Sequence, residues 1–181
     1  MKTLEDQMSF YAAYHQDARN KATHFVGVPL IAFSLMIPLG WLRADVGGVA
    51  LSAAMIVTAI LLLYYLVLDI PLGLAMVAVF GLMLWAADPL SQASFAVSLG
   101  WFLVLFVGGW ALQLWGHVYE GRKPALVDNL FQVFVAPIFL AAEVFFALGY
   151  KPRLHEAVQR RALDMRAQAG IGIAPGDLKS A

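Results

Sequence analysis

Residues 90–116 read LSQASFAVSLGWFLVLFVGGWALQLWG, a run that contains no Asp, Glu, Lys or Arg. A helix needs about 20 mostly apolar residues to cross a bilayer, so this run is long enough to span one. The whole chain has the same character, because 61% of its 181 residues are hydrophobic, only 13% are charged, and the mean hydropathy is +0.75. Soluble domains lie nearer half apolar and a quarter charged. The sequence therefore predicts an all-α integral membrane protein, built as a helical bundle.

Four apolar runs are expected to form membrane-spanning helices: Phe25–Leu42, Val46–Leu68, Ile70–Ala87 and Leu90–Gly116. The breaks are expected at Asp69-Ile70-Pro71 and at Asp88-Pro89, since proline disfavours helix in the residue before it.

A fifth run, Leu130–Tyr150, contains Pro137 and Glu143. We expect it to form a re-entrant helical hairpin bent near Pro137, with a full fifth crossing as the alternative. Glu143 is expected to face the protein interior, because a carboxylate in lipid is costly. There it can balance a buried cation or accept a hydrogen bond from a metal-bound histidine. The bundle thus has about four to five transmembrane helices.

Orientation follows from the basic residues that flank the runs. Cytoplasmic loops carry an excess of Lys and Arg, and four crossings put the N-terminal segment and the loop after residue 116 on one side. That side is predicted to be cytoplasmic, in a bacterial inner membrane or a membrane of the endoplasmic-reticulum type. Residues 1–155 are expected to form the membrane-embedded domain, starting with an amphipathic helix. Residues 156–181 are expected to form a polar helix and then a disordered tail.

Composition also excludes several functional classes. Zero net charge argues against a nucleic-acid partner, and the absence of cysteine removes disulfides, thiolate ligands and iron–sulfur clusters. Four histidines are too few for the histidine-rich di-iron membrane oxygenases, and their positions at the ends of the runs do not suit a transmembrane haem. Little chain is left for a separate soluble domain, so any chemistry is expected at the helix ends. Composition does not indicate the oligomeric state.

Three histidines lie where apolar runs begin or end. His15 and His24 bracket the entry to the first run, and His117 follows the fourth, so four crossings bring all three to one side of the bilayer. Imidazole suits iron, zinc or copper, and three ligands leave positions open for water, oxygen or substrate. We therefore predict a metal site formed by His15, His24 and His117. The alternative for His15 and His24 is a solvated helix residue and an interfacial cap, and His155 is expected at the surface.

Polar residues accompany these histidines at helical spacing. Asn20 shares a helix face with His24, while Gln113 and Glu120 form one polar stripe with His117. Such a stripe in a membrane helix faces protein or water, where it binds a ligand or makes interhelical hydrogen bonds. Glu120 and Asn20 are the candidate catalytic residues, and Gln113 is a candidate substrate-binding residue.

The loop after His117 adds two cations, Arg122 and Lys123. They are candidates for binding an anionic headgroup or carboxylate. The alternative is that they only mark the cytoplasmic side.

Two motifs resemble the signatures of a small multi-span membrane family of 2-hydroxy fatty acid dioxygenases, the type that acts in phytosphingosine breakdown and fatty acid α-oxidation. The first comprises Tyr14-His15, Asn20-Lys21 and the stretch His24–Pro29, and the second comprises residues 113–126, QLWGHVYEGRKPAL. Gly149-Tyr150, at the end of the apolar run that contains Glu143, fits as well. The resemblance covers residues 9 to 155.

This resemblance implies an Fe(II)-dependent enzyme that shortens a 2-hydroxy fatty acid by one carbon with molecular oxygen. His15, His24 and His117 would be the iron ligands or their close partners. The chemistry suits a membrane lipid substrate, because a 2-hydroxy carboxylate can chelate iron while the helices hold its acyl chain. Two alternatives remain: a zinc-dependent membrane lipid hydrolase, in which Glu120 is the base for a bound water, and a non-enzymatic membrane scaffold.

Overall fold

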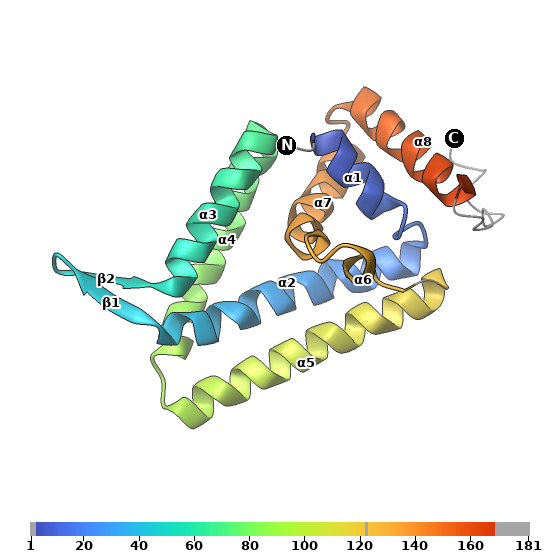
Figure 1. Ribbon diagram of the computed structural model, residues 1–181. Coiled ribbons are helices and arrows are strands. Elements are labelled where there is room, and N and C mark those ends of the chain that lie inside the picture. The colour runs from blue at the N-terminus through green and yellow to red at the C-terminus, as the bar shows by residue number, and fades with distance from the viewer. Residues whose placement is uncertain (1–2, 122, 169–181) are drawn as a thin grey trace. The chain divides into compact units, whose positions relative to one another are not determined.

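The computed structural model describes residues 3–121 and 123–168, and within them the chain forms eight helices and one antiparallel strand pair (Figure 1). The helices are α1 (Leu4–Ala12), α2 (Ala18–Trp41), α3 (Ala53–Leu68), α4 (Ile70–Ser91), α5 (Phe95–Glu120), α6 (Ala125–Asp128), α7 (Gln132–Ala147) and α8 (Pro152–Gln168), and the strands are β1 (Arg43–Val46) and β2 (Val49–Ser52). The predicted all-α membrane bundle is confirmed as the fold class. The chain packs as two compact units, one built from residues up to Ala22 and from Trp115 onward, the other from Thr23 to Leu114.

Three of the described helices, α2, α4 and α5, are long and apolar enough to cross a membrane. The helices α3 and α7 are also apolar, but each has 16 residues. A helix of that length measures about 24 Å, somewhat less than the ~30 Å hydrocarbon core of a bilayer. The expectation of four spans of full length therefore holds for three of the runs.

The second run is shorter because its first residues are not helical. The expected helix start at Val46 is wrong, since residues 43–52 form a β-hairpin in which Val46 pairs with Val49. Its turn residues, Gly47 and Gly48, have φ values of +64° and +84°. A two-residue hairpin turn of type I′ requires positive φ at both positions, which glycine adopts without strain. The Asp45 side chain also accepts a hydrogen bond from the Gly48 N–H at 2.9 Å.

The two expected helix breaks have different outcomes. The break at Asp69 is confirmed, because Asp69 ends α3 and also caps α4, accepting a hydrogen bond from Leu72 N at 3.1 Å. Pro71 lies in the first turn of α4, where its missing N–H has no helical partner to lose. The break at Asp88-Pro89 is wrong, because α4 continues to Ser91. The proline φ angle is compatible with a helix, and its position only two residues before the helix end limits the disruption.

The fifth run does not bend at its proline either. Helix α7 is continuous through Pro137, so the expected hairpin near that residue is wrong, and the chain turns instead before Gln132 and after Ala147. After that turn α8 is a polar helix, as expected, although it begins at Pro152. The expected disorder of the Gly-rich end, from Gly170 on, lies outside the described residues.

In the first unit, α1 contacts both α7 and α8 (Figure 1). Thr3 caps α1 in a reciprocal pair of hydrogen bonds with Asp6, which also forms an ion pair with Arg161 of α8 at 2.6 Å. Helix α8 turns a stripe of Val158, Ala162 and Arg166 inward. The short N-terminal helix is therefore held by segments from the other end of the chain.

In the second unit, α2 and α5 run antiparallel with their backbones in close contact (Figure 1). A Cβ atom at Gly27 would lie 2.9 Å from the carbonyl oxygen of Gly109, and one at Gly109 would lie 2.7 Å from Ile31 Cγ1. Small residues at a helix crossing permit such an approach in membranes, where packing rather than hydrophobicity drives association. At the other end of this crossing, Trp41 Nε1 donates a hydrogen bond to Ser98 Oγ at 2.6 Å.

Replacing Gly109 with alanine is expected to lower thermal stability, because the added methyl group overpacks the crossing. Overpacking typically costs about 1–3 kcal/mol. The adjacent Gly108 is a matched control: a Cβ there would meet nothing within 4 Å, and alanine in a helix is favoured over glycine by up to about 1 kcal/mol. Melting curves of the two variants in detergent make the comparison. Equal melting temperatures would contradict a contact that is specific to Gly109.

A labelling experiment tests the topology. Cysteines placed singly at Ala18 and Val127, both exposed positions, should react with an impermeant reagent from the same side of sealed vesicles, because both belong to the first unit. A cysteine at Ala50 in the hairpin should react from the other side if α2 crosses the membrane. The natural chain has no cysteine that could interfere. Labelling of Ala18 and Val127 from opposite sides would contradict the shared cytoplasmic face.

Candidate metal centre

His15 lies in the short link between α1 and α2 and is 2% exposed. Its Nδ1 is 2.8 Å from the carbonyl oxygen of Tyr11. A carbonyl only accepts hydrogen bonds, so Nδ1 carries the proton and the lone pair of the ring is on Nε2. Metal-ligating histidines are commonly held in this way, with the second ring nitrogen donating to a carbonyl or carboxylate.

Aromatic rings fix the plane of the His15 imidazole. The Tyr11 ring stacks on it at 4.0 Å with an interplanar angle of 6°, and Phe139 of α7 packs beside both rings. Burial raises the pKa of the Tyr11 phenol, so this residue stays neutral. The Tyr11 residue therefore supplies both the stacking surface and the carbonyl that orients the imidazole.

His117 lies in the last turn of α5, and its ring centroid is 5.0 Å from that of His15. His24 follows Asn20 by one turn of the continuous helix α2. Each of the three residues is at least 94% buried, and each offers one ring nitrogen such that these atoms all lie within 4.8 Å of one another. The buried three-histidine group can therefore bind a metal ion.

The donor set and its dimensions fit such an ion. Metal-bound imidazole nitrogens lie ~2.0–2.1 Å from the metal, so two of them on opposite sides of one ion are about 4.2 Å apart. The three ring nitrogens lie within 4.8 Å of one another, so they need to move only slightly closer together to bind one ion. Neutral imidazoles bind zinc, copper, iron and nickel, and the three nitrogens alone do not select among them. His155 is not part of the group, because its ring stacks on Phe146 at 4.7 Å.

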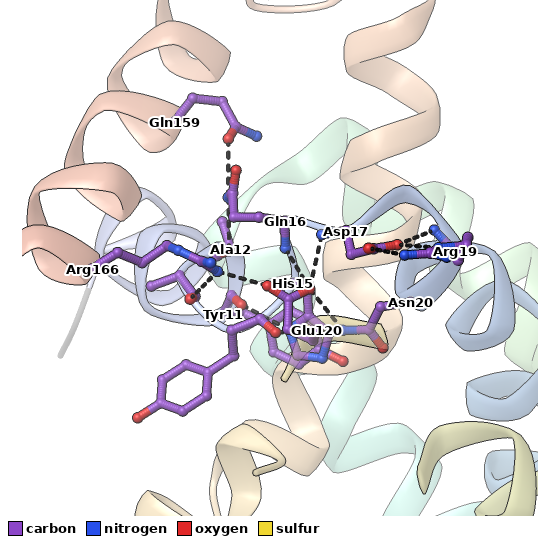
Figure 2. Close-up of polar contacts among 12 residues, drawn as sticks. Tyr11, Ala12, His15, Gln16, Asp17, Arg19, Asn20, Glu120, Gln159 and Arg166 are labelled. Carbon is purple, nitrogen blue, oxygen red and sulfur yellow. Dashed lines mark hydrogen bonds and ion pairs between the residues drawn. The ribbon is translucent and has the colours of Figure 1, made fainter. Parts of the chain in front are cut away.

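Glu120 stands at the centre of a network of hydrogen-bond donors (Figure 2). Its side chain is 1% exposed, and its Oε1 accepts from Arg166 Nη1 at 2.6 Å. Its Oε2 accepts from the backbone N–H groups of Gln16 at 3.0 Å and Asp17 at 2.8 Å, and from Asn20 Nδ2 at 3.1 Å. This carboxylate ties the end of α5 to the link that carries His15.

The candidate catalytic residues are thus both engaged in this network. The Asn20 amide group donates to Glu120 and also approaches the carbonyl oxygen of Tyr14 at 3.4 Å. Four hydrogen bonds from protein groups already engage the two oxygens of the Glu120 carboxylate. The geometry suits Glu120 and Asn20 to holding the histidine segments in place.

The candidate substrate-binding residues have different surroundings. Gln113 lies one turn before His117 on α5 and is 6% exposed, and its Nε2 has no hydrogen-bond partner among the described residues. Lys123 is largely exposed and forms an ion pair with Asp128 at 2.5 Å. Asp128 in turn accepts a hydrogen bond from the Tyr14 hydroxyl group at 2.6 Å. Arg122 lies outside the described residues.

Two features of the site were missed or only partly predicted. The Glu143 carboxylate is expected to balance a cation, and it pairs with Lys21 at 2.8 Å, although the sequence analysis does not identify Lys21 as that cation. The role of Arg166 was not predicted at all. The spacing of Val158, Ala162 and Arg166 at every fourth residue of a polar helix could have indicated this role. It places Arg166 at the end of the buried stripe of α8.

Comparisons with known proteins show which family the chain belongs to. Residues 1–148 match the family model described as "2-hydroxy-palmitic acid dioxygenase Mpo1-like". Over 159 residues the chain is 35% identical to the 2-hydroxy-palmitic acid dioxygenase MPO1 of Saccharomyces cerevisiae, covering 86% of this chain and 87% of the yeast protein. No solved structure matches the chain. A family model that covers most of the chain, together with a relative of this identity, shows that the chain belongs to the Mpo1-like family.

Proposed function

We propose that this protein is an Fe(II)-dependent dioxygenase that shortens 2-hydroxy fatty acids by one carbon at a membrane. The observation that carries the proposal is the group of three buried imidazoles at the ends of long apolar helices. Such a site combines a metal that can react with oxygen and an environment that accepts an acyl chain. Membership of the Mpo1-like family supports a dioxygenase that acts on a 2-hydroxy fatty acid, since the yeast relative is named as a 2-hydroxy-palmitic acid dioxygenase.

His15, His24 and His117 would hold the iron. Iron(II), when bound, supplies the redox chemistry of oxygen and leaves coordination positions for the hydroxyl and carboxylate oxygens of the substrate. The Tyr11 carbonyl group keeps the His15 lone pair on Nε2, and the Tyr11 and Phe139 rings prevent the imidazole from rotating away. These residues thus keep the donor set ordered.

Gln113 would orient the substrate. Its buried Nε2 lies one helical turn from His117 and would donate a hydrogen bond to a hydroxyl or carboxylate oxygen. Leaving such a donor without a partner is costly, so a ligand that accepts from it gains affinity. Lys123 would reach a carboxylate only by exchanging its ion pair with Asp128, and we assign to it and to Arg122 an outer role in attracting the anionic headgroup.

The zinc hydrolase is the alternative that the geometry disfavours. It needs Glu120 as a general base for a water molecule, yet the oxygens of Glu120 accept hydrogen bonds from Arg166, Asn20 and two backbone N–H groups. A non-enzymatic scaffold, the third possibility, has no use for three imidazoles gathered in a buried group.

Substitution of the histidines tests the metal assignment. His15→Ala, His24→Ala and His117→Ala should each lose bound iron together with oxygen consumption on 2-hydroxypalmitic acid, because a site with two imidazoles binds metal far more weakly. His155→Ala is the matched control and should keep both, since its ring packs on Phe146. Metal analysis of protein purified in detergent, beside an oxygen electrode, makes the measurement. Zinc in the wild-type protein with no oxygen consumption would replace the proposal by the hydrolase.

Gln113→Leu tests the orienting donor. Leucine has nearly the same volume but no N–H, so iron content should stay normal while kcat/KM for the hydroxy acid falls about 10-fold, as expected for a lost hydrogen bond worth ~1–1.5 kcal/mol. Lys123→Met should change kcat/KM less. Steady-state oxygen consumption gives both values. An unchanged kcat/KM in Gln113→Leu would assign the side chain to packing against Gly27 alone.

A further inference from the structure

One side chain from the C-terminal helix contacts both of the segments that carry His15 and His117. Arg166 Nη1 lies 2.6 Å from the Oε1 atom of Glu120, three residues after His117 (Figure 2). It also lies 3.4 Å from the carbonyl oxygen of Ala13, two residues before His15. The rings of those two histidines are themselves 5.0 Å apart. A single guanidinium group therefore spans the two chain segments from which the pair projects.

The ion pair between Arg166 and Glu120 is buried, so its loss is expected to disturb the segments that it joins. The Arg166 side chain is 5% exposed and that of Glu120 is 1% exposed. Removing one partner of a buried ion pair leaves the other charge without compensation, which is strongly unfavourable. Without Arg166, Glu120 is expected to turn toward water, and the hydrogen bonds it accepts from Gln16 N and Asp17 N would loosen with it.

Helix α8 has a second contact with the same link. Gln159 Oε1 accepts a hydrogen bond from Gln16 Nε2 at 3.3 Å (Figure 2). Both α8 side chains thus contact residues within two positions of His15. The family model ends at residue 148, before α8 begins, so this contribution comes from a part of the chain outside that match.

We propose that Arg166 is a positioning residue, through which α8 holds the His15 and His117 segments at the spacing needed to bind a metal. Arg166 touches neither the metal nor the substrate in this account and acts through Glu120 and the backbone of Ala13. The effect of Arg166 on the spacing of the two segments does not depend on the proposed function. Its effect on metal affinity rests on that function.

The same helix provides a matched control. Arg161 also joins α8 to α1, but at an exposed surface, where it pairs with Asp6 at 2.6 Å and Glu5 at 3.7 Å. Arg161→Met removes a cation that docks α8 and leaves the Glu120 network intact. Arg166→Met removes the buried cation with little change in volume, and Arg166→Lys keeps the charge but loses the planar fork of the guanidinium group.

The experiment uses the full chain in detergent and has two readouts. Hydrogen–deuterium exchange of peptides from residues 13–20, in metal-free protein, reports whether the Gln16 and Asp17 amides remain bound to Glu120. Titration with Co(II), whose d–d absorption reports ligand geometry, gives metal affinity. Arg166→Met should speed exchange in these peptides and weaken Co(II) binding by about 10- to 100-fold, the range seen for residues that support metal ligands. Arg166→Lys should fall between, and Arg161→Met should stay within about twofold of wild type.

The outcomes separate the two proposals. Wild-type exchange rates in Arg166→Met would overturn the positioning role, and so would equal effects of Arg166→Met and Arg161→Met, which would reduce Arg166 to a docking contact. Failure of the wild-type protein to bind Co(II) or iron would instead overturn the metal assignment, and the exchange data alone would then decide the role of Arg166. Should Arg166→Met not fold, Arg166→Lys against Arg161→Met gives the same comparison.

Discussion

A carboxylate withdrawn from water must find donors within the protein, and Glu120 finds them in three separate parts of the chain. The link between α1 and α2 provides two backbone N–H groups, the first turn of α2 provides the Asn20 amide group, and α8 provides Arg166. Since Glu120 itself ends α5, four segments converge on one side chain. The three histidines lie in three of these four segments, so the hydrogen bonds to one buried carboxylate join the segments that carry them.

The helices of the second unit are held together by close packing instead. Gly27 and Gly109 let the backbones of α2 and α5 touch, and Gly73 allows an equally close approach of α4 to Leu66 of α3. At these crossings the missing side chain of glycine is what permits the close helix spacing. The contrast is typical of membrane proteins: small residues pack the apolar helices, and buried polar side chains gather within the protein, here around Glu120.

Much of this arrangement could be predicted from the sequence, and the limits have physical causes. The apolar runs and the positions of His15, His24 and His117 at their ends indicated both the bundle and the metal group, because hydropathy acts locally and crossings alternate sides. Local turn chemistry overrode hydropathy at Gly47-Gly48, where a hairpin replaced the start of a helix. Pro89 and Pro137 were interpreted as breaks, yet both fit within helices. The partnership of Arg166 with Glu120 joins residues 46 positions apart, and no local pattern reports such a pairing.

The order in which the chain is synthesised gives this architecture a further property. Helices α3 and α4 are joined by Asp69 alone, so their contacts form between neighbours in sequence and can be made as soon as both have been inserted. The first unit has the opposite character, because α1 is made first and its partner α8 last. At about 5–20 residues per second, the ribosome needs on the order of 10–30 s to pass from the one to the other. Throughout that interval α1 lacks its α8 partner, and the contacts of Arg166 with Glu120 and with the Ala13 carbonyl oxygen form only after α8 has been made.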